Sequence, residues 1–320
     1  MGNTILLLAL AVVLFLAELA YFRIAARYNI VDNPNFRSSH DQPVIRGGGI
    51  LFFVGLIIWF FYEGRPMPWF MVAATLVALV SFVDDISGTT PLRRFTFHSI
   101  AMLLVFYQLS LFAWPVWLII VAIIVCIGTL NAFNFMDGIN GITGINALVA
   151  LGTFGYVNQY VVRFTDPSLI IVITISVLVF LFFNFRKHAR CFAGDVGSVT
   201  LAFILVFLLL SLIHRTGNYS WALLFLIFGI DSVITIVYRI WKGEDIFKAH
   251  RTHVYQYMTN ELRMSHLIIS LVYGVVQLAV NIVVIRYFRE FDWVVVGFVV
   301  AFAGGYVIVR ERVLKEVLVG

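Results

Sequence analysis

Charged residues are scarce in this 320-residue chain, where they make up 12% of all positions. A soluble domain carries roughly 25% charged residues and about 45–50% apolar ones. Here the hydrophobic share reaches 62%, and 31 residues are phenylalanine. A globular core could not bury so much apolar surface. The composition therefore argues against a soluble protein and indicates that lipid surrounds much of the chain.

Other absences exclude particular kinds of site. The chain has only two cysteines, Cys126 and Cys191, which we expect at different depths, so neither a disulfide nor a cysteine metal site is predicted. No G-x-x-x-x-G-K-[ST] run is present, which argues against a P-loop. The glycine-rich IRGGGI (45–50) opens an apolar run and follows no predicted strand, so a Rossmann turn is rejected.

What the chain does have is a series of apolar runs near the ~20 residues that a bilayer core requires. These runs predict an all-α polytopic membrane bundle of about eleven transmembrane helices, forming a single catalytic domain over residues 1–320. The expected helices lie at about 4–22, 47–62, 68–83, 95–113, 116–133, 141–162, 168–185, 197–213, 220–238, 266–285 and 292–309.

Basic residues are distributed unevenly between the two sides of this predicted bundle. If the eleven runs cross in turn, 17 of the 22 Lys and Arg residues fall on one side. The positive-inside rule then places the N-terminus outside and the C-terminus in the cytoplasm, with the first run as a retained anchor. The basic pI of about 9.3 is explained by this topology, and no nucleic-acid partner is expected.

Polar, glycine-containing clusters fall on the same predicted cytoplasmic face. They are VDDISGTTPLRR (83–94), NAFNFMDGINGITG (131–144), CFAGDVGSVT (191–200) and GEDIFKAHRTHVYQYM (243–258). Each alone is also typical of a structural feature: a solvated acid pair, a turn, a helix cap or a surface helix. Together they point to phosphoryl transfer, because Mg²⁺ takes one or two carboxylates plus substrate phosphates, and Arg and His stabilise the phosphate charge.

The ordered set VDD (83–85), NAFNFMDG (131–138), GDVGS (194–198) and HRTH (250–253) resembles the polyprenyl-phosphate N-acetylhexosamine-1-phosphate transferases. DNPNFRSSHDQPVIRGGGI (32–50) looks like the first cytoplasmic loop of that family. The resemblance implies a multi-pass enzyme of the inner (plasma) membrane. It would move a HexNAc-1-phosphate from a UDP-sugar to undecaprenyl phosphate and release UMP at a cytoplasmic active site.

The resemblance also implies residue roles. Its matching positions assign Mg²⁺ binding, with Mn²⁺ as an alternative, to Asp195. The catalytic positions implied are Asp84, Asp85, Asp137 and His253. Substrate binding is implied for Arg46, Asn134, Asn140, Asp231, His250 and Arg251. Asp231 is also singled out by its place within an apolar run, because an intramembrane acid is costly and usually functional.

Departures from the family pattern bear on the branch. DDISGTT lacks the lysine that follows the acid pair in the peptidoglycan branch, HRTH is a shorter histidine cluster, and Asn140 replaces a common aspartate. These differences favour the enzymes that start O-antigen or capsule repeats. Phospho-MurNAc-pentapeptide transfer stays open as an alternative, as does ion-coupled transport, which Asp231 alone suits. The HexNAc and the oligomeric state, including a homo-oligomer, stay open.

Overall fold

The computed structural model describes residues 2–34, 42–245, 250–288, 290 and 292–319. Residues 35–41 of the predicted first-loop motif and 246–249 before His250 lie outside the described residues. The helices are α1 Gly2–Arg27, α2 Ile50–Tyr62, α3 Pro68–Ser87, α4 Pro91–Gln108, η1 Leu111–Ala113, α5 Val116–Met136, α6 Ile142–Tyr160, α7 Pro167–Asn184, α8 Gly194–Thr216, η2 Tyr219–Phe225, α9 Leu226–Trp241, α10 Val254–Gln256, η3 Tyr257–Glu261, α11 His266–Tyr287 and α12 Trp293–Val319. The strands are β1 Val31–Asp32 and β2 Val44–Ile45.

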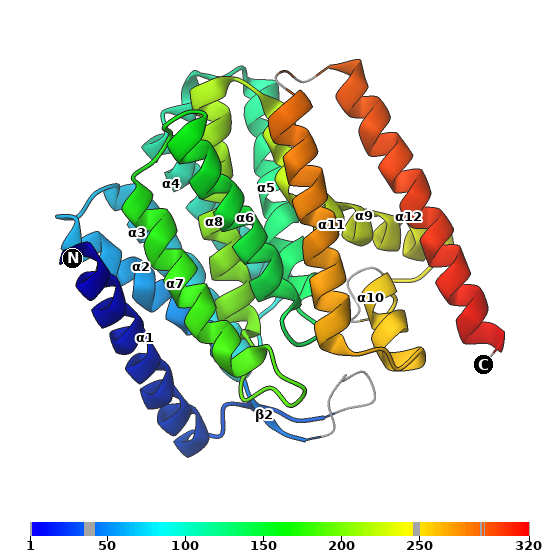
Figure 1. The fold of residues 1–320 in the computed structure, drawn as a ribbon, viewed down its shortest axis with the longest axis horizontal. Helices are drawn as coiled ribbons and strands as arrows, with labels where there is room; N and C mark the ends of the chain where they lie inside the picture. Colours follow the sequence, from blue (N-terminus) through cyan, green and yellow to red (C-terminus); the bar gives the residue numbers. More distant parts are fainter. Residues whose placement is uncertain (1, 35–41, 246–249, 289, 291, 320) are drawn as a thin grey trace.

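The architecture is an all-α bundle of the multi-pass membrane type (Figure 1). Each of the eleven predicted runs lies on a helix, with η2 and α9 together forming the ninth. Within the described residues, eight helices are long and apolar enough to cross a membrane. Of the other three, α2 has only 13 residues, which span about 20 Å at 1.5 Å per residue. The helices α4 and α6 carry more polar residues.

The centre of the bundle is α8, whose side chains are buried continuously from Val196 to Ile213. A helix that is apolar on all sides belongs in the interior. It packs mainly against α3, α5 and α2, and the rings of Phe70 and Phe207 stack with centroids 3.8 Å apart. The N-terminus of α8, which carries Asp195, is therefore fixed at the middle of one end of the bundle.

Close helix contacts in this bundle depend on glycine. A Cβ added to Gly49, at the start of α2, would lie 2.3 Å from the Cα of Gly197 in α8. A Cβ on Gly197 would lie 2.6 Å from the Cα of Gly49. Because both contacts are with backbone, no side chain can move aside, and small residues are what let such backbones approach. The first turns of α2 and α8 are thereby held against each other.

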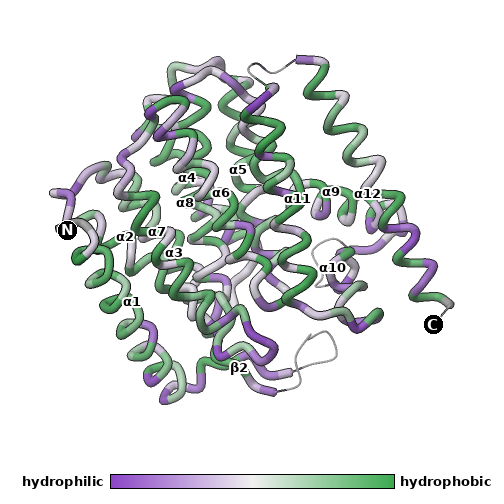
Figure 2. The backbone as a smooth tube through the Cα atoms, viewed as in Figure 1, coloured by the Kyte–Doolittle hydropathy of each residue, from purple (hydrophilic) through white to green (hydrophobic). Residues whose placement is uncertain are grey.

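A two-stranded antiparallel hairpin, β1–β2, covers the same end, with Val31 opposite Ile45. The chain before α8 joins it, since Phe192 N donates to Ile45 O over 2.8 Å and Gly48 N donates to Phe192 O over 2.9 Å. IRGGGI therefore does follow a strand, contrary to the prediction. This strand belongs to an antiparallel hairpin, and the pairing places Arg46 beside the start of α8. Figure 2 shows hydrophilic residues gathering near β2 and α10, whereas hydrophobic residues follow the helices.

Candidate active site

Asp85 joins the end of α3 to the start of α8. Its Oδ1 accepts from the backbone N–H of Asp195 at 2.8 Å, and its Oδ2 accepts from that of Val196 at 2.9 Å. These are orphan donors of a helix first turn, which a carboxylate satisfies well. The Asp85 side chain is 0% exposed. This carboxylate is thus occupied by the fold, and the first N–H groups of α8 face it instead of a ligand.

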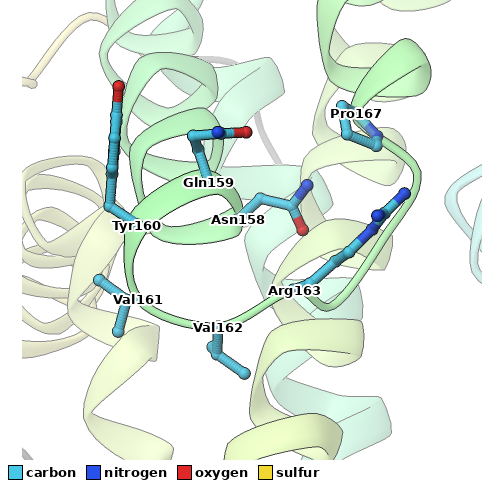
Figure 3. A pocket seen from close by; sticks show the side chains of 7 residues that line it. All are labelled: Asn158, Gln159, Tyr160, Val161, Val162, Arg163 and Pro167. Atoms are coloured by element: carbon cyan, nitrogen blue, oxygen red, sulfur yellow. The ribbon is translucent and has the colours of Figure 1, made fainter.

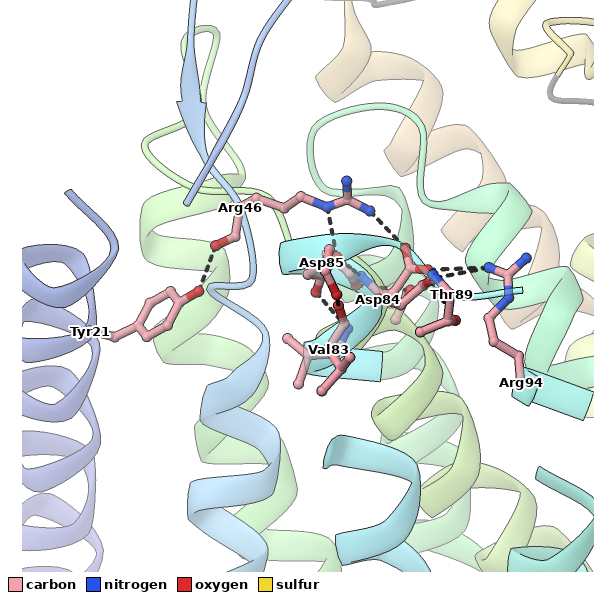
Figure 4. Close-up of polar contacts among 12 residues, drawn as sticks. Tyr21, Arg46, Val83, Asp84, Asp85, Thr89 and Arg94 are labelled. Atoms are coloured by element: carbon pink, nitrogen blue, oxygen red, sulfur yellow. Dashed lines mark hydrogen bonds and ion pairs between the residues drawn. The ribbon is translucent and has the colours of Figure 1, made fainter. Parts of the chain in front are cut away.

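Arg46 lies over the same carboxylate (Figure 4). Its Nε is 2.6 Å from Asp85 Oδ1 and its Nη2 is 3.1 Å from Asp195 Oδ1. Tyr21 of α1 fixes its backbone, because the hydroxyl donates to the Arg46 carbonyl over 2.6 Å. Burial lowers the pKa of the guanidinium, but the Asp85 and Asp195 carboxylates outweigh this and raise it overall. Arg46 is therefore a fixed positive charge at the start of α8.

Asp84 contacts the turn that follows α3 and the start of α4. Its Oδ1 accepts from the hydroxyl of Thr89 at 2.6 Å and from the Thr89 backbone N–H. Its Oδ2 lies 3.1 Å from Nη1 of Arg94, which is 3.5 Å from Oδ2 of Asp195. Arg94 therefore bridges the two carboxylates. Sequence reasoning counted this arginine only as a topology charge. The available signal was its place one turn into a helix that Thr90 caps and Pro91 begins.

The donor set can be compared with the needs of a divalent cation. Among the described residues, no three His, Cys, Asp or Glu side chains converge enough to hold a metal ion by themselves. Mg²⁺ does not require such a cage, because one or two carboxylates and substrate phosphates suffice. Asp195 and Asp84 supply hard oxygen donors on either side of one guanidinium, and both side chains are partly exposed, at 14% and 9%. This pair fits Mg²⁺, and Asp85 does not.

Asp137 lies in the loop between α5 and α6, at the same end of the bundle. Its pKa is raised from 3.8 to about 6, mainly by burial. The nearby Asp85 carboxylate also raises it and Arg46 lowers it, which places Asp137 in the electrostatic neighbourhood of the first cluster. Asn134, one turn earlier, is partly exposed. Both residues therefore lie at the end of the bundle that carries Asp85 and Arg46.

Asn140 has a different environment from the predicted one. Its side-chain amide donates to the Arg186 carbonyl over 2.7 Å, and its backbone carbonyl accepts from the Ser270 hydroxyl at 2.8 Å. The residue is 5% exposed. Its side chain thus connects the α5–α6 and α7–α8 loops, and substrate binding by this amide is not supported by the geometry. The buried Asn184, the last residue of α7, also contacts the α5–α6 loop, since its Oδ1 accepts from Gly141 N over 2.7 Å.

The HRTH loop contacts the Asp137 loop through Tyr255. The hydroxyl of Tyr255 donates to the Phe135 carbonyl over 2.9 Å. A Cβ on Gly138 would lie 2.2 Å from the same hydroxyl, so glycine is required for this contact. Tyr255 was not among the predicted site residues, although it lies two positions after the HRTH motif. The α9–α11 connection and the α5–α6 loop are thereby held together.

His253 and Asp231 form a buried pair. The Nδ1 of His253 is 2.7 Å from Oδ1 of Asp231, and Tyr273 of α11 donates to Oδ2 of Asp231 over 2.6 Å. Asp231 is 0% exposed and His253 2% exposed, and Nε2 of His253 has no hydrogen-bond partner among the residues that the structure describes. Asp231 was predicted to bind substrate. Its carboxylate is instead enclosed by these partners, so it orients His253.

His250 and Arg251, which were predicted to bind substrate, differ in charge. The Nδ1 of His250 is 2.9 Å from the Thr252 hydroxyl, and burial lowers the pKa of His250 to about 4. This imidazole is therefore neutral near pH 7 and supplies hydrogen bonds instead of a positive charge. Arg251 forms an ion pair with Glu261 at 2.6 Å.

The structure also has a pocket at the opposite end of the bundle, around the α6–α7 loop (Figure 3). It is lined by Asn158, Arg163 and Pro167, among others. The Oδ1 of Asn158 accepts from the backbone of Phe164 and Thr165, so its carbonyl holds the loop. None of the predicted catalytic residues lines this pocket.

Comparison with known proteins agrees with this geometry. Residues 67–213, which run from α3 through α8, match glycosyl transferase family 4. The chain is 32% identical over 271 residues to the undecaprenyl-phosphate alpha-N-acetylglucosaminyl 1-phosphate transferase of Pasteurella multocida (strain Pm70), covering 76% of this chain and 75% of that protein. It is 26% identical over 278 residues to a probable undecaprenyl-phosphate N-acetylglucosaminyl 1-phosphate transferase of Bacillus subtilis (strain 168), covering 78% and 76%.

These similarities and the ordered motifs define a membrane glycosyl-1-phosphate transferase class. The chain belongs to glycosyl transferase family 4, which confirms the family predicted from its sequence.

Proposed function

We propose that this chain transfers a HexNAc-1-phosphate from a UDP-sugar to undecaprenyl phosphate, releases UMP and so starts a lipid-linked cell-surface glycan. The observation that carries the proposal is that Asp195 is contacted by Arg46 on one side and Arg94 on the other. Two arginines around partly exposed carboxylates suit a diphosphate and its cation. The names of the relatives favour N-acetylglucosamine as the first donor to test.

The membrane arrangement forms part of the proposal. All eleven helical runs cross the bilayer, with the acidic end of the bundle on the cytoplasmic side of the inner membrane. The excess of Lys and Arg in the loops at this end supports that orientation. A water-soluble nucleotide would then reach the site from the cytoplasm, while the acceptor phosphate would approach from the inner leaflet.

Asp195 with Asp84 would hold Mg²⁺, or Mn²⁺ as an alternative, which would neutralise charge on the diphosphate. Arg46 and Arg94 now pair with carboxylates. When the substrate binds, its diphosphate oxygens would replace those carboxylates as partners of the two arginines. Asp137 and Asn134 face the same end, and His253 offers Nε2. The donor is thereby oriented with its β-phosphorus toward the acceptor.

In the reaction we propose, an oxygen of undecaprenyl phosphate attacks the β-phosphorus of the UDP-sugar. The new bond joins two phosphates, and the bond between the β-phosphorus and the bridging oxygen of UMP breaks. Because a phosphomonoester has a second pKa of about 6, the acceptor is already mostly dianionic near neutrality. Asp84 therefore steers the acceptor more than it deprotonates it, and positioning supplies most of the rate.

A covalent route through a phospho-aspartate is the alternative mechanism. It predicts that labelled phosphosugar remains on the purified protein when undecaprenyl phosphate is omitted. Direct attack predicts no such trapped label.

The test of the function is UMP release by the purified enzyme in detergent with a panel of UDP-HexNAc donors. We expect release with UDP-GlcNAc or another HexNAc only when both undecaprenyl phosphate and Mg²⁺ are present, and EDTA abolishes it. Asp195→Asn raises the Mg²⁺ concentration needed for half-maximal rate. If UDP-MurNAc-pentapeptide alone serves as donor, the peptidoglycan alternative holds. UMP release at the same rate without undecaprenyl phosphate contradicts both transferase functions.

A further inference from the structure

The last helix, α12, contributes a buried arginine to the loop that carries His253. Arg310 is 2% exposed, and its Nη1 donates to the Thr252 carbonyl over 3.1 Å. The same nitrogen donates to the Thr235 hydroxyl of α9 over 3.2 Å. The guanidinium lies over the ring of Tyr238, 4.5 Å from its centroid. In the sequence, Arg310 is one of the basic residues on the predicted cytoplasmic side.

These contacts close a ring around His253. Thr235 Oγ1 lies 3.4 Å from Oδ1 of Asp231, which holds Nδ1 of His253 at 2.7 Å. Thr252, whose carbonyl Arg310 binds, directly precedes His253. The peptide before the histidine is thus fixed by α12, and its imidazole is fixed by α9. Rotation of the imidazole would break the contact between Nδ1 of His253 and Oδ1 of Asp231.

Stability alone explains Arg310 poorly. A buried charge is costly, and apolar residues of similar size often stabilise a protein at least as well. The Nε and Nη2 of Arg310 have no hydrogen-bond partners within the described residues, which adds to the cost. In the described part of the chain, Nε2 of His253 has no hydrogen-bond partner either. The arrangement is thus unfavourable for folding by itself, but it leaves one atom of His253 oriented and free.

We propose that Arg310 is a positioning residue, which fixes the Thr252 carbonyl and thereby aims Nε2 of His253 at the diphosphate of the substrate. This inference rests on the proposed transferase function. It extends the site to the end of the chain, beyond the residues 67–213 that match the family.

The direct test is hydrogen–deuterium exchange of Arg310→Met, which keeps the length of the side chain but removes its donors. We expect faster exchange in peptides covering residues 252–256, with unchanged exchange at the start of α8. Arg312→Met, at an exposed position of the same helix, is the control and leaves both segments unchanged. Unchanged exchange at 252–256 in Arg310→Met overturns the inference. This measurement does not depend on activity, so it stands even if the proposed function fails.

A double-mutant cycle then tests the route to the chemistry. Arg310→Met should lower kcat up to about 100-fold, because a misplacement of 1 Å can cost that much. When His253→Gln is already present, adding Arg310→Met should lower kcat by a further factor of about 2 or less, because the two residues act as one unit. Arg310→Lys, which keeps the charge, should restore part of the rate. Multiplicative effects of the two single variants would show that Arg310 does not act through His253.

Discussion

The backbone N–H of Asp195 donates to Oδ1 of Asp85 over 2.8 Å, so the second acid of the VDD motif forms the N-terminal cap of the helix that carries the GDVGS aspartate. This one contact sets two motifs of the sequence in fixed relation. It also separates the roles of two adjacent acids. The carboxylate of Asp85 is bonded to the first turn of α8, whereas that of Asp84 contacts Thr89 and Arg94 and stays partly exposed.

This separation predicts different effects for two isosteric substitutions. Asp85→Asn puts an amide N–H₂ where the carboxylate now accepts backbone donors, so it should destabilise the protein by about 1–3 kcal/mol and also lower activity. Asp84→Asn weakens the contacts with Thr89 and Arg94, so it should cost less stability than Asp85→Asn, while activity falls. Melting in detergent and UMP release measure the two effects, with the exposed Glu311→Gln as control. Equal melting temperatures for both aspartate variants would contradict the assignment.

A second prediction concerns the pH dependence of Asp84→Asn. Below about pH 6 the acceptor phosphate keeps its last proton, so any help from a base counts most there. If Asp84 accepts that proton, the deficit of Asp84→Asn is larger at pH 6 than at pH 8. Rates of wild type and variant across this range decide the matter, and a constant ratio assigns Asp84 to steering alone.

Asp137 should affect stability through its raised pKa. The folded protein binds this proton more tightly than the unfolded chain, since the pKa rises from 3.8 to about 6. The contribution of the group to stability is therefore complete below about pH 3.8 and is lost as the pH rises through about 6. Relative to wild type, Asp137→Asn should be more thermostable at pH 8 than at pH 5. Melting in EDTA measures this; the same difference at both pH values would show that Asp137 is not buried as described.

The contact between Gly49 and Gly197 predicts a strong position effect. Gly49→Ala forces a Cβ against the backbone of α8, so it should separate the first turns of α2 and α8 and reduce both melting temperature and UMP release. Gly152→Ala is the matched control, because nothing lies within 4 Å of the added Cβ in α6. There alanine should be neutral or stabilise by up to about 1 kcal/mol. Comparable losses in both variants would argue against the tight contact.

Some of this site followed from the sequence, and some could not. Apolar runs located the helices because length and hydropathy are local properties, and the family motifs brought Asp195, Asp84 and Arg46 to one end. Contacts between distant segments carry no such local signal. The occupied carboxylate of Asp85 and the bridging Arg94 depend on how α3, α4 and α8 pack. For the same reason, the enclosure of Asp231 by Tyr273 was missed, and it turned a predicted substrate ligand into an orienting group.

Two further features of the structure depend on burial. Cys191 Sγ lies 3.4 Å from Oε1 of Glu18, whose side chain is fully buried between α1 and the α7–α8 loop. Nothing in the apolar run around Glu18 indicates that partner. Similarly, HRTH alone does not indicate that burial lowers the pKa of His250 to about 4 and leaves this imidazole neutral near pH 7. Charge read from sequence is altered wherever the fold excludes water.

The central claim is that the phosphate next to the sugar moves with it. The most direct measurement uses UDP-GlcNAc, or whichever UDP-HexNAc the enzyme accepts, labelled with ³²P at the β-phosphorus. After reaction with undecaprenyl phosphate and Mg²⁺, we expect the label in the lipid phase and unlabelled UMP in the aqueous phase. Label left in aqueous UDP while the sugar enters the lipid would identify an ordinary glycosyl transfer and contradict the account.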